Sequence, residues 1–363
     1  MTRLGPVDLQ QRLQRFPRAR LGFFPTPLAP LSRLGAHLGG PTVLMKREDL
    51  SGLALGGNKV RMLEFVLGDA IAQGADTFIA GGGKSQSNHG RLCAAAARVC
   101  GLEPIIILSE DATAPGTKEA NLLVQFLLGS DTRIVSDDDI RTDAPPRFGL
   151  HHLMEAEAER QRLRGRRPYV LPTSSIPLAT LGFVAAALEL AEQLEALDTP
   201  RAHIVMTSTG ATQAGLLITA MALGLPWTIT GVACASALRA SENVVRLANG
   251  AAELLEIDAR IDASDVRTLD CSGRGYGQTD PDSLEALHLV ARLEAVLLDP
   301  VYTAKGMAGM IGLVREGEIP PDETVVFVHT GGTPTMFAYT DELTADRFDV
   351  RRTVIDRVAE VSR

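Results

Sequence analysis

The chain has 363 residues, of which 45% are hydrophobic and 22% charged, and its formal net charge at pH 7 is −8. This is the composition of a globular protein long enough for two domains or one large domain, and its acidity argues against nucleic acid or an anionic membrane as the main partner. No apolar run approaches the roughly 18 to 20 residues of a membrane span, and no signal-peptide core follows the N-terminus, so we expect a cytoplasmic protein. The four cysteines show neither metal-ligand spacing nor a disulfide framework.

Helical and apolar strand patterns alternate along the chain. Helical periodicity predicts helices at 61–74, 89–100 (with Asn88 as N-cap), 117–129, 149–163, 181–194 and 212–224. Short apolar runs predict strands at 77–80, 104–108, 132–135, 169–172, 203–206, 227–233 and 324–328. Short strands that are apolar on both faces and alternate with helices indicate parallel sheets covered on both sides. In such sheets ligands bind at the carboxyl ends of the strands, where the glycine-rich loops of this chain lie.

The segment GGGKSQSNHG, residues 81–90, resembles a nucleotide-binding loop only in part. A Walker loop needs a glycine five positions before the glycine of Gly-Lys-Ser, because its backbone N–H groups wrap around the phosphates. That position holds Phe78, whose bulky side chain cannot take the turn. The sequence therefore disfavours an ATPase, and Lys84 needs another explanation.

Two other segments place polar residues just before predicted helices. Lys59 follows the glycines of GLALGGNKVRMLE, where a buried lysine could form a Schiff base and a solvated surface lysine is the alternative. Ser87 and Asn88 lie at a helix N-terminus, where free N–H groups favour an anion such as a carboxylate, with simple capping as the alternative. Spacing alone places His89 in no catalytic triad.

A further segment, TSTGATQAGL at 207–216, follows a strand and opens an apolar helix. The N–H groups of Gly210, Ala211 and Thr212 would surround a small concavity there, beside the hydroxyls of Thr209 and Thr212. This arrangement suits a phosphate monoester, and an ordinary capped helix would have the same pattern.

Two tyrosines and a histidine pair complete the candidates. Tyr276 and Tyr302 both lie in turn sequences, GRGYGQTD and LDPVYTAKGMAGM, where Tyr302 could simply pack and Tyr276 between glycines is harder to assign to a core. His151, His152 and Glu155 could share a helical face as metal ligands, but a solvated helix surface is the commoner origin of such a run. We therefore expect no metal site.

Several of these segments together resemble one family. GLALGGNKVRMLE, QSNHGR, TGATQAGL, YGQ, DPVYTAKGMAGM and HTGG are similar, in this order, to the pyridoxal-phosphate (PLP) enzymes of the 1-aminocyclopropane-1-carboxylate (ACC) deaminase and D-cysteine desulfhydrase family. The resemblance runs from FFPTPLAPLSRL to HTGGTPTMFAY, nearly the whole chain. It implies the tryptophan-synthase-β fold (fold type II), an α/β fold with two open twisted, mostly parallel sheets flanked by helices.

The resemblance also implies a domain division and an assembly. A large PLP-binding domain would comprise residues 1–64 and 181–363, and a small domain would comprise 65–180. The cofactor would lie between the two domains. Members of the family are commonly homodimers, so we expect a homodimer that acts on a small amino acid.

The same resemblance assigns roles to single residues. Catalytic roles fall to the Schiff-base lysine and to residues beside the substrate: Lys59, Ser87, Tyr276 and Tyr302. The cofactor would be held by the 3′-oxygen partner, the phosphate loop and two later threonines: Asn88, Thr209, Gly210, Ala211, Thr212, Thr303 and Thr330. Contacts with the substrate fall to Ser87, Asn88, His89 and Lys84.

Two positions separate the branches of this family. Deaminases have Glu directly after the tyrosine of DPVY and Leu in HLGG, whereas this chain has Thr303 and Thr330, as desulfhydrases do. A carboxylate would keep the pyridine nitrogen of PLP protonated, whereas a threonine hydroxyl would not. The resemblance therefore implies a carbon–sulfur lyase that releases pyruvate and ammonia by β-elimination from a substrate such as D-cysteine or L-cysteate. ACC deamination and β-replacement by a synthase of specialised metabolism are alternatives.

Three departures from the family leave the substrate open. Lys84 and Ser85 stand where relatives have a small or apolar pair, and Lys84 could bind an acidic substrate such as a sulfonate or lie at the surface. TSSI at 173–176 stands where desulfhydrases have GGSN, one residue shorter and without the asparagine. The phosphate loop TGATQAGL is nearer the deaminase version than the GSGGTHAGL of desulfhydrases.

Overall fold

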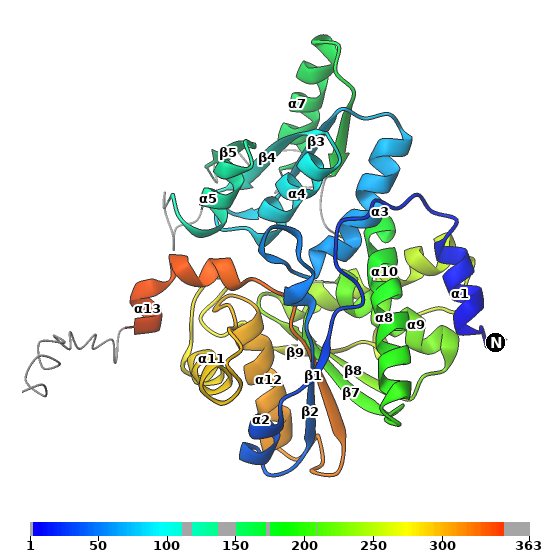
Figure 1. Ribbon diagram of the computed structural model, residues 1–363, viewed down its shortest axis with the longest axis vertical. Helices are drawn as coiled ribbons and strands as arrows, with labels where there is room; N and C mark the ends of the chain where they lie inside the picture. The colour runs from blue at the N-terminus through cyan, green and yellow to red at the C-terminus, as the bar shows by residue number, and fades with distance from the viewer. Residues whose placement is uncertain (1–2, 111–117, 137–149, 172–174, 209, 345–363) are drawn as a thin grey trace, which may run out of the picture.

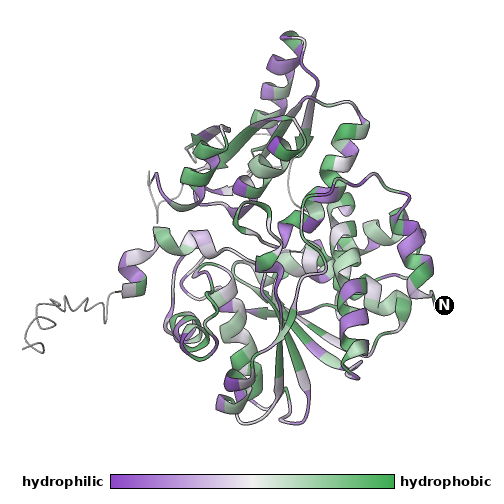
Figure 2. Ribbon diagram, in the orientation of Figure 1, coloured by the Kyte–Doolittle hydropathy of each residue, from purple (hydrophilic) through white to green (hydrophobic). Residues whose placement is uncertain are grey.

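A computed structural model describes residues 3–110, 118–136, 150–171, 175–208 and 210–344. In these residues the chain forms a six-stranded and a four-stranded sheet, each flanked by helices (Figure 1). Figure 2 shows hydrophobic residues gathered on the strands and inner helices, and hydrophilic residues marking outer helices such as α7 (His151–Leu163). The α/β class with two mostly parallel sheets is therefore confirmed.

The larger sheet is parallel apart from one edge strand. Its strands follow the order β1 (Leu28–Pro30), β2 (Thr42–Lys46), β10 (Thr324–Val328), β7 (Ala202–Thr207), β8 (Trp227–Ala233) and β9 (Arg267–Asp270). Only β1 runs antiparallel to its neighbour among these strands. Its faces are covered by α8 (Pro177–Ala196), α9 (Ala211–Leu223) and α10 (Ala237–Leu254) on one side, and by α2 (Ser32–His37), α11 (Pro281–Glu294) and α12 (Thr303–Arg315) on the other.

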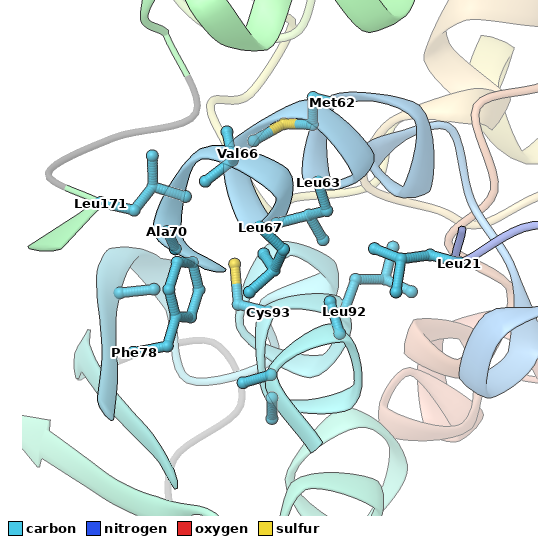
Figure 3. Packing of buried hydrophobic residues seen from close by; sticks show 14 of the residues in the cluster. Leu21, Met62, Leu63, Val66, Leu67, Ala70, Phe78, Leu92, Cys93 and Leu171 are labelled. Atoms are coloured by element: carbon cyan, nitrogen blue, oxygen red, sulfur yellow. The ribbon is translucent and has the colours of Figure 1, made fainter. Parts of the chain in front are cut away.

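The smaller sheet is parallel throughout and buries alternate residues on its two faces. Its strands follow the order β5 (Asp131–Val135), β4 (Glu103–Ser109), β3 (Thr77–Lys84) and β6 (Pro168–Leu171). Phe78 packs with α3 (Lys59–Ala72) and α4 (Asn88–Val99), as Figure 3 shows, whereas the next residue, Ile79, packs with α7 on the opposite face. This alternation follows from the period of two in a strand.

The remaining described elements are short or peripheral. They are α1 (Pro6–Leu13), η1 (Glu48–Leu50), η2 (Leu53–Leu55), α5 (Ala120–Leu127), η3 (Ala263–Asp265), η4 (Thr333–Ala338) and α13 (Thr340–Thr344). The 20 residues of α8 are long and apolar enough to cross a membrane by length and composition alone, contrary to the expectation of no such run. Because α8 packs against α3, α9 and α10, we interpret it as a core helix.

One predicted helix start was wrong. The N-cap of α4 is Ser87, whose Oγ accepts a hydrogen bond from the Gly90 N–H at 3.2 Å, and Asn88 is the first helical residue. A serine oxygen at the cap satisfies one of the unpaired N–H groups of the first turn, and this leaves the Asn88 amide for other partners.

The domain division stays a prediction. The two sheets draw their strands from the two predicted sets of residues, but the boundaries at 64/65 and 180/181 fall inside α3 and α8. Helices that cross from one sheet to the other therefore hold the two halves together.

Candidate active site

A cavity of about 220 Å³ opens where the chain leaves β3 of the small sheet and β7 and β10 of the large sheet. This is the carboxyl edge of the parallel strands, where the sequence predicts the ligand. Eight of the predicted site residues line the cavity: Lys59, Ser87, Asn88, His89, Ala211, Thr212, Tyr302 and Thr330.

Four predicted site residues do not line the cavity. Gly210 caps α9 with a φ of 140°, and Thr303 is buried beneath the start of α12. Tyr276 is 37% exposed, and its hydroxyl meets that of Tyr302. Lys84 is the last residue of β3, beside Ser109 of β4. Thr209 and part of the TSSI segment, residues 173–174, lie outside the described residues.

The turn before Lys59 has an unusual backbone that one buried arginine holds. Ala54 and Leu55 adopt positive φ angles of 41° and 72°. Arg91 of α4 donates hydrogen bonds to the carbonyls of Ala54 and Gly56, the latter at 3.0 Å. A side chain from α4, which flanks the small sheet, thus fixes the loop that presents Lys59, because a guanidinium can donate to several carbonyls at once.

Lys59 lies in surroundings that favour a neutral amine. All five lysines of the chain are among the described residues, and Lys59 is the one that lines the cavity. Burial lowers the pKa of Lys59, the nearby Asp299 carboxylate opposes this, and the charge of Arg91 adds to it. A lowered pKa leaves more of the amine unprotonated and nucleophilic at neutral pH.

His89 is a neutral neighbour of this amine. Burial, reinforced by the charge of Lys59, lowers the pKa of His89 to about 3. The ring is therefore uncharged at neutral pH and can accept as well as donate a hydrogen bond. Cys93, one turn further along α4, is a buried thiol 3.5 Å from His89 Nε2.

The first turn of α3 is anchored by a buried charge cluster. Arg61 is 1% exposed and bonds in a bidentate manner to Glu48 (2.6 and 2.8 Å) and to Glu189 (2.8 and 3.0 Å). Lys46 also pairs with Glu189. Because Arg61 is two residues from Lys59, this cluster fixes the direction in which α3 leaves the cavity.

The N-terminus of α9 forms the opposite wall of the cavity. Its first N–H groups, at Ala211 and Thr212, carry the positive end of the helix dipole. The Thr212 hydroxyl accepts a hydrogen bond from Asn58 Nδ2 at 3.0 Å, which ties the helix end to the turn of Lys59. Ser208 Oγ, just before this helix, is buried and has no hydrogen-bond partner among the described residues. This donor set is suited to an anion.

Comparison with known proteins identifies the family. The model of the family "Pyridoxal-phosphate dependent enzyme" matches residues 19–331. The chain is 42% identical over 341 residues to the ACC deaminase of Burkholderia vietnamiensis, covering 91% of this chain and 98% of the relative. It is 40% identical over 339 residues to the ACC deaminase of Burkholderia multivorans, covering 90% of this chain and 97% of the relative. The chain belongs to the PLP-dependent enzymes.

Solved structures support the same assignment. A structure described as an ACC deaminase homologue matches with a TM-score of 0.82 and 33% identity, covering 94% of this chain and 99% of the other. Threonine deaminase isoform 2 of Solanum lycopersicum shares the fold alone, with a TM-score of 0.64 at 17% identity over 95% of this chain and 89% of the other. The chain is thus a fold type II PLP-dependent lyase of the ACC deaminase family, and its cofactor is pyridoxal 5′-phosphate.

The residues of the cavity fit this cofactor. A phosphate monoester suits the N-terminus of α9, and an aldehyde requires a neutral amine such as Lys59. Among the described residues that line the cavity there is no carboxylate, whereas the guanidinium of Arg91 is cationic. An anionic cofactor therefore meets no like charge among the described residues that line the cavity.

Thr303 and Thr330, the two threonines that the sequence resemblance singled out, have different surroundings. Thr303 is fully buried, and its hydroxyl donates to Asp299 Oδ1 at 2.8 Å. Thr330 lines the cavity between the carboxyl end of β10 and the Gly331–Gly332 turn. Of these two residues, Thr330 is the one placed to meet a ligand.

Two residues that hold loops of the site, Arg91 and Lys305, were not assigned from the sequence. Arg91 lies in the quoted QSNHGR motif and holds the Lys59 turn, and its position three residues after Asn88 on one helix is a signal that could have found it. Lys305, in DPVYTAKGMAGM, is 1% exposed and donates to the carbonyls of Ser272 (2.9 Å) and Gly275 (3.0 Å). It thereby secures the loop of Tyr276, which no spacing in the sequence reveals.

The histidine pair that was weighed as a possible metal site lies on α7. His151 Nε2 lies 4.0 Å from Glu155 Oε1 on an exposed part of α7. In the described part of the chain, no group of three or more His, Cys, Asp or Glu side chains is placed to hold a metal ion.

Proposed function

We propose that this enzyme deaminates a small α-amino acid to a 2-oxo acid and ammonia, with ACC as the first candidate substrate. The observation that carries the proposal is Lys59, an amine of lowered pKa in a carboxylate-free cavity opposite a helix N-terminus. ACC is the first candidate because the relatives at 40–42% identity over 90–91% of the chain are named ACC deaminases. A cytoplasmic location and a homodimer accompany the proposal as predictions.

The side chains around the cavity supply distinct functions. PLP, when bound, withdraws electrons from the α-carbon of the substrate. Lys59 would hold the cofactor covalently and, once released, would move a proton, at a ring methylene of ACC, whose α-carbon bears no hydrogen, or at the α-carbon of a β-substituted alanine. The N–H groups at the start of α9 bind its phosphate. Ser87 and neutral His89 bind the carboxylate or the reacting carbon of the substrate.

Two tyrosines complete the proton-handling groups. Tyr302 lines the cavity, its ring centre lies 5.8 Å from Lys59 Nζ, and its hydroxyl shares a hydrogen bond with Tyr276. Burial and the contact with Tyr276 raise the pKa of Tyr302 well above its usual value. Tyr302 therefore stays protonated at neutral pH and serves as a proton donor to a leaving carbon or sulfur atom.

A second candidate is β-elimination from a β-substituted alanine such as D-cysteine. The specific observation in its favour is that no carboxylate lines the cavity among the described residues, whereas deaminases of the family have Glu at the position of Thr303. A neutral partner leaves the pyridine nitrogen a weaker electron sink, which is sufficient when a good leaving group departs from the β-carbon. Lys84 does not line the cavity, so a sulfonate would not meet its charge there.

A panel of amino acids separates the candidates. The purified holoenzyme is supplied with ACC and with both enantiomers of cysteine, cysteate and β-chloroalanine, and 2-oxobutyrate and pyruvate are measured separately. Release of 2-oxobutyrate from ACC supports deamination, and pyruvate alone supports β-elimination. Neither product from any substrate would contradict both candidates and favour β-replacement.

The role of Lys59 has its own test. Lys59→Ala is expected to abolish the visible absorption band that PLP gives in the wild-type protein, because the covalent link is lost. Lys118→Ala is the matched control, since Lys118 is an exposed lysine away from the cavity. An unchanged band in Lys59→Ala would show that another amine holds the cofactor.

A further inference from the structure

The first residue of α4, Asn88, belongs to a hydrogen-bond network that reaches both halves of the molecule. Its Oδ1 accepts hydrogen bonds from Asn121 Nδ2 at 3.0 Å and from the Thr335 hydroxyl at 3.2 Å. Asn121 is the second residue of α5, whereas Thr335 lies in η4, beyond the last strand of the large sheet. Asn121 and Thr335 are both almost fully buried.

The orientation of the Asn121 amide is fixed by partners that each have only one hydrogen-bonding role. Arg91 Nε donates to one end at 2.7 Å, and a guanidinium cannot accept, so that end is the oxygen. The backbone carbonyl of Gln86 accepts from the other end at 2.9 Å, and a carbonyl cannot donate, so that end is the NH₂. Two independent contacts therefore assign the same orientation to the Asn121 amide.

The orientation of Asn88 follows from that of Asn121. Since the NH₂ of Asn121 donates to Asn88, the end of Asn88 that it touches is the oxygen. The Thr335 hydroxyl lies 3.0 Å from Asn121 Nδ2, whose two hydrogens already serve the Gln86 carbonyl and Asn88, and it gives its own proton to the same Asn88 oxygen. The NH₂ of Asn88 is the end left over, no described residue accepts from it, and Asn88 lines the cavity.

We propose that Asn121, with Thr335, is a positioning residue that turns the NH₂ of Asn88 toward the cofactor, so that Asn88 donates to the phenolic oxygen of PLP. The proposal rests on the proposed function and on the role that the family resemblance implies for Asn88, as the partner of this 3′-oxygen. Without Asn121 the Asn88 amide could rotate and present its carbonyl oxygen, which would repel the phenolate. The direction of this hydrogen bond is thus set at Arg91 and passed through Asn121 to Asn88.

The direction of the expected effect follows from the charge on the phenolic oxygen. A donated hydrogen bond stabilises the phenolate and so favours loss of the proton from the PLP chromophore. Losing the bond raises the pH midpoint of the visible absorption change, and it also weakens binding of PLP. A hydrogen bond to a charged group corresponds to a shift of about one pH unit and about a tenfold change in the dissociation constant.

The central variant is Asn121→Asp in the full-length holoenzyme. An aspartate has the same shape and still accepts from Arg91, but it cannot donate to Asn88. We expect the pH midpoint to rise by about one unit, or the PLP dissociation constant to rise about tenfold. The matched control is Asn249→Asp in α10, where a part-buried asparagine bonds only to the backbone of Ile261, away from the cavity.

A second background separates positioning from a general loss of structure. In an Asn88→Ala protein there is no amide to orient, so adding Asn121→Asp should cause no further change in midpoint or dissociation constant. The same extra change in both backgrounds would overturn the proposal, as would an Asn121→Asp holoenzyme with wild-type midpoint and wild-type PLP affinity. If Asn121→Asp does not fold, Thr335→Val tests the proposal by the same criteria, with a smaller shift expected.

The outcomes also distinguish this proposal from the proposed function. A wild-type protein that shows no visible band with PLP contradicts the proposed function itself. A wild-type protein with a normal band and an insensitive Asn121→Asp variant contradicts only the positioning role.

Discussion

Replacing Arg61 by methionine is expected to destabilise the protein strongly. The guanidinium forms four hydrogen bonds of 2.6 to 3.0 Å with Glu48 and Glu189, and the side chains of these acids are 3% and 14% exposed. Removing one partner of a buried ion pair leaves the other charge without compensation, which typically costs about 3–5 kcal/mol. Lys46 still pairs with Glu189, so the uncompensated charge falls mainly on Glu48.

The assay is urea denaturation followed by fluorescence. The single tryptophan, Trp227, lies on β8 and reports unfolding of the large sheet. The matched control is Arg315→Met, because Arg315 pairs with Glu285 at the surface, where both side chains are about half exposed (51% and 49%). Exposed pairs contribute about 0–1 kcal/mol, so the control should unfold close to wild type.

The pH dependence of unfolding independently checks that the ion pairs of Arg61 stabilise the fold. Burial raises the pKa of Glu189, but the hydrogen bonds and charge of Arg61 outweigh burial and hold this pKa below its ordinary value of 4.5. A carboxylate with a depressed pKa contributes stability above about pH 4.5 that is lost as the pH falls. The gap between wild type and Arg61→Met should therefore be widest near neutral pH and should narrow below pH 4.

Two results would refute this reasoning. One is a free energy of unfolding for Arg61→Met that equals that of Arg315→Met. The other is failure of Glu48→Gln to restore part of the stability of Arg61→Met, since that second change removes the unpaired charge.

Two further predictions concern the packing of helices and the tyrosine loop. Gly182→Ala should lower the free energy of unfolding by about 1–3 kcal/mol, because a Cβ there would lie 2.2 Å from the Arg61 carbonyl oxygen. Gly312→Ala should raise the free energy of unfolding by up to about 1 kcal/mol, because a Cβ there has no atom within 4 Å and alanine favours a helix. Melting temperatures of the two variants check both expectations. Lys305→Met should reduce kcat while PLP affinity stays near wild type, because it frees the loop of Tyr276; steady-state kinetics and a PLP titration check this, and equal losses in both would contradict a role confined to the loop.

Most of the fold could be predicted because its strands are short apolar runs between helices. Ile105 and Ile106 illustrate this, since they pack on opposite faces of the small sheet, and only a strand covered on both sides needs both to be apolar. The strands that were missed lie at or near the edges of the large sheet. In β9, with the sequence RTLD, pairing with β8 decides the structure, whereas the local sequence is half charged.

The candidate site was predicted less completely, because loops bring together residues that are far apart in the sequence. Both Lys59 and Lys84 follow glycines, and spacing alone cannot say which amine enters the cavity. The structure separates them, since Lys84 ends a strand beside Ser109, whereas Lys59 begins a helix whose preceding loop touches the turn after β10. At that contact, a Cβ on Gly331 would lie 2.6 Å from the Cα of Gly57.

The orientation of the Asn88 amide is harder to predict from the sequence than its position. A motif can indicate that an asparagine lies beside the cofactor, but the direction in which its amide points depends on Asn121 and Thr335, which are 33 and 247 residues away. Asn121 lies in α5, beside the small sheet, and Thr335 lies in η4, after the last strand of the large sheet. The Asn88 amide can therefore be ordered only when the two halves of the enzyme are in contact. The contacts that assemble the cavity therefore also set the direction of its hydrogen bonds. A substitution that weakens the contact between the two halves should weaken PLP binding before it unfolds either sheet.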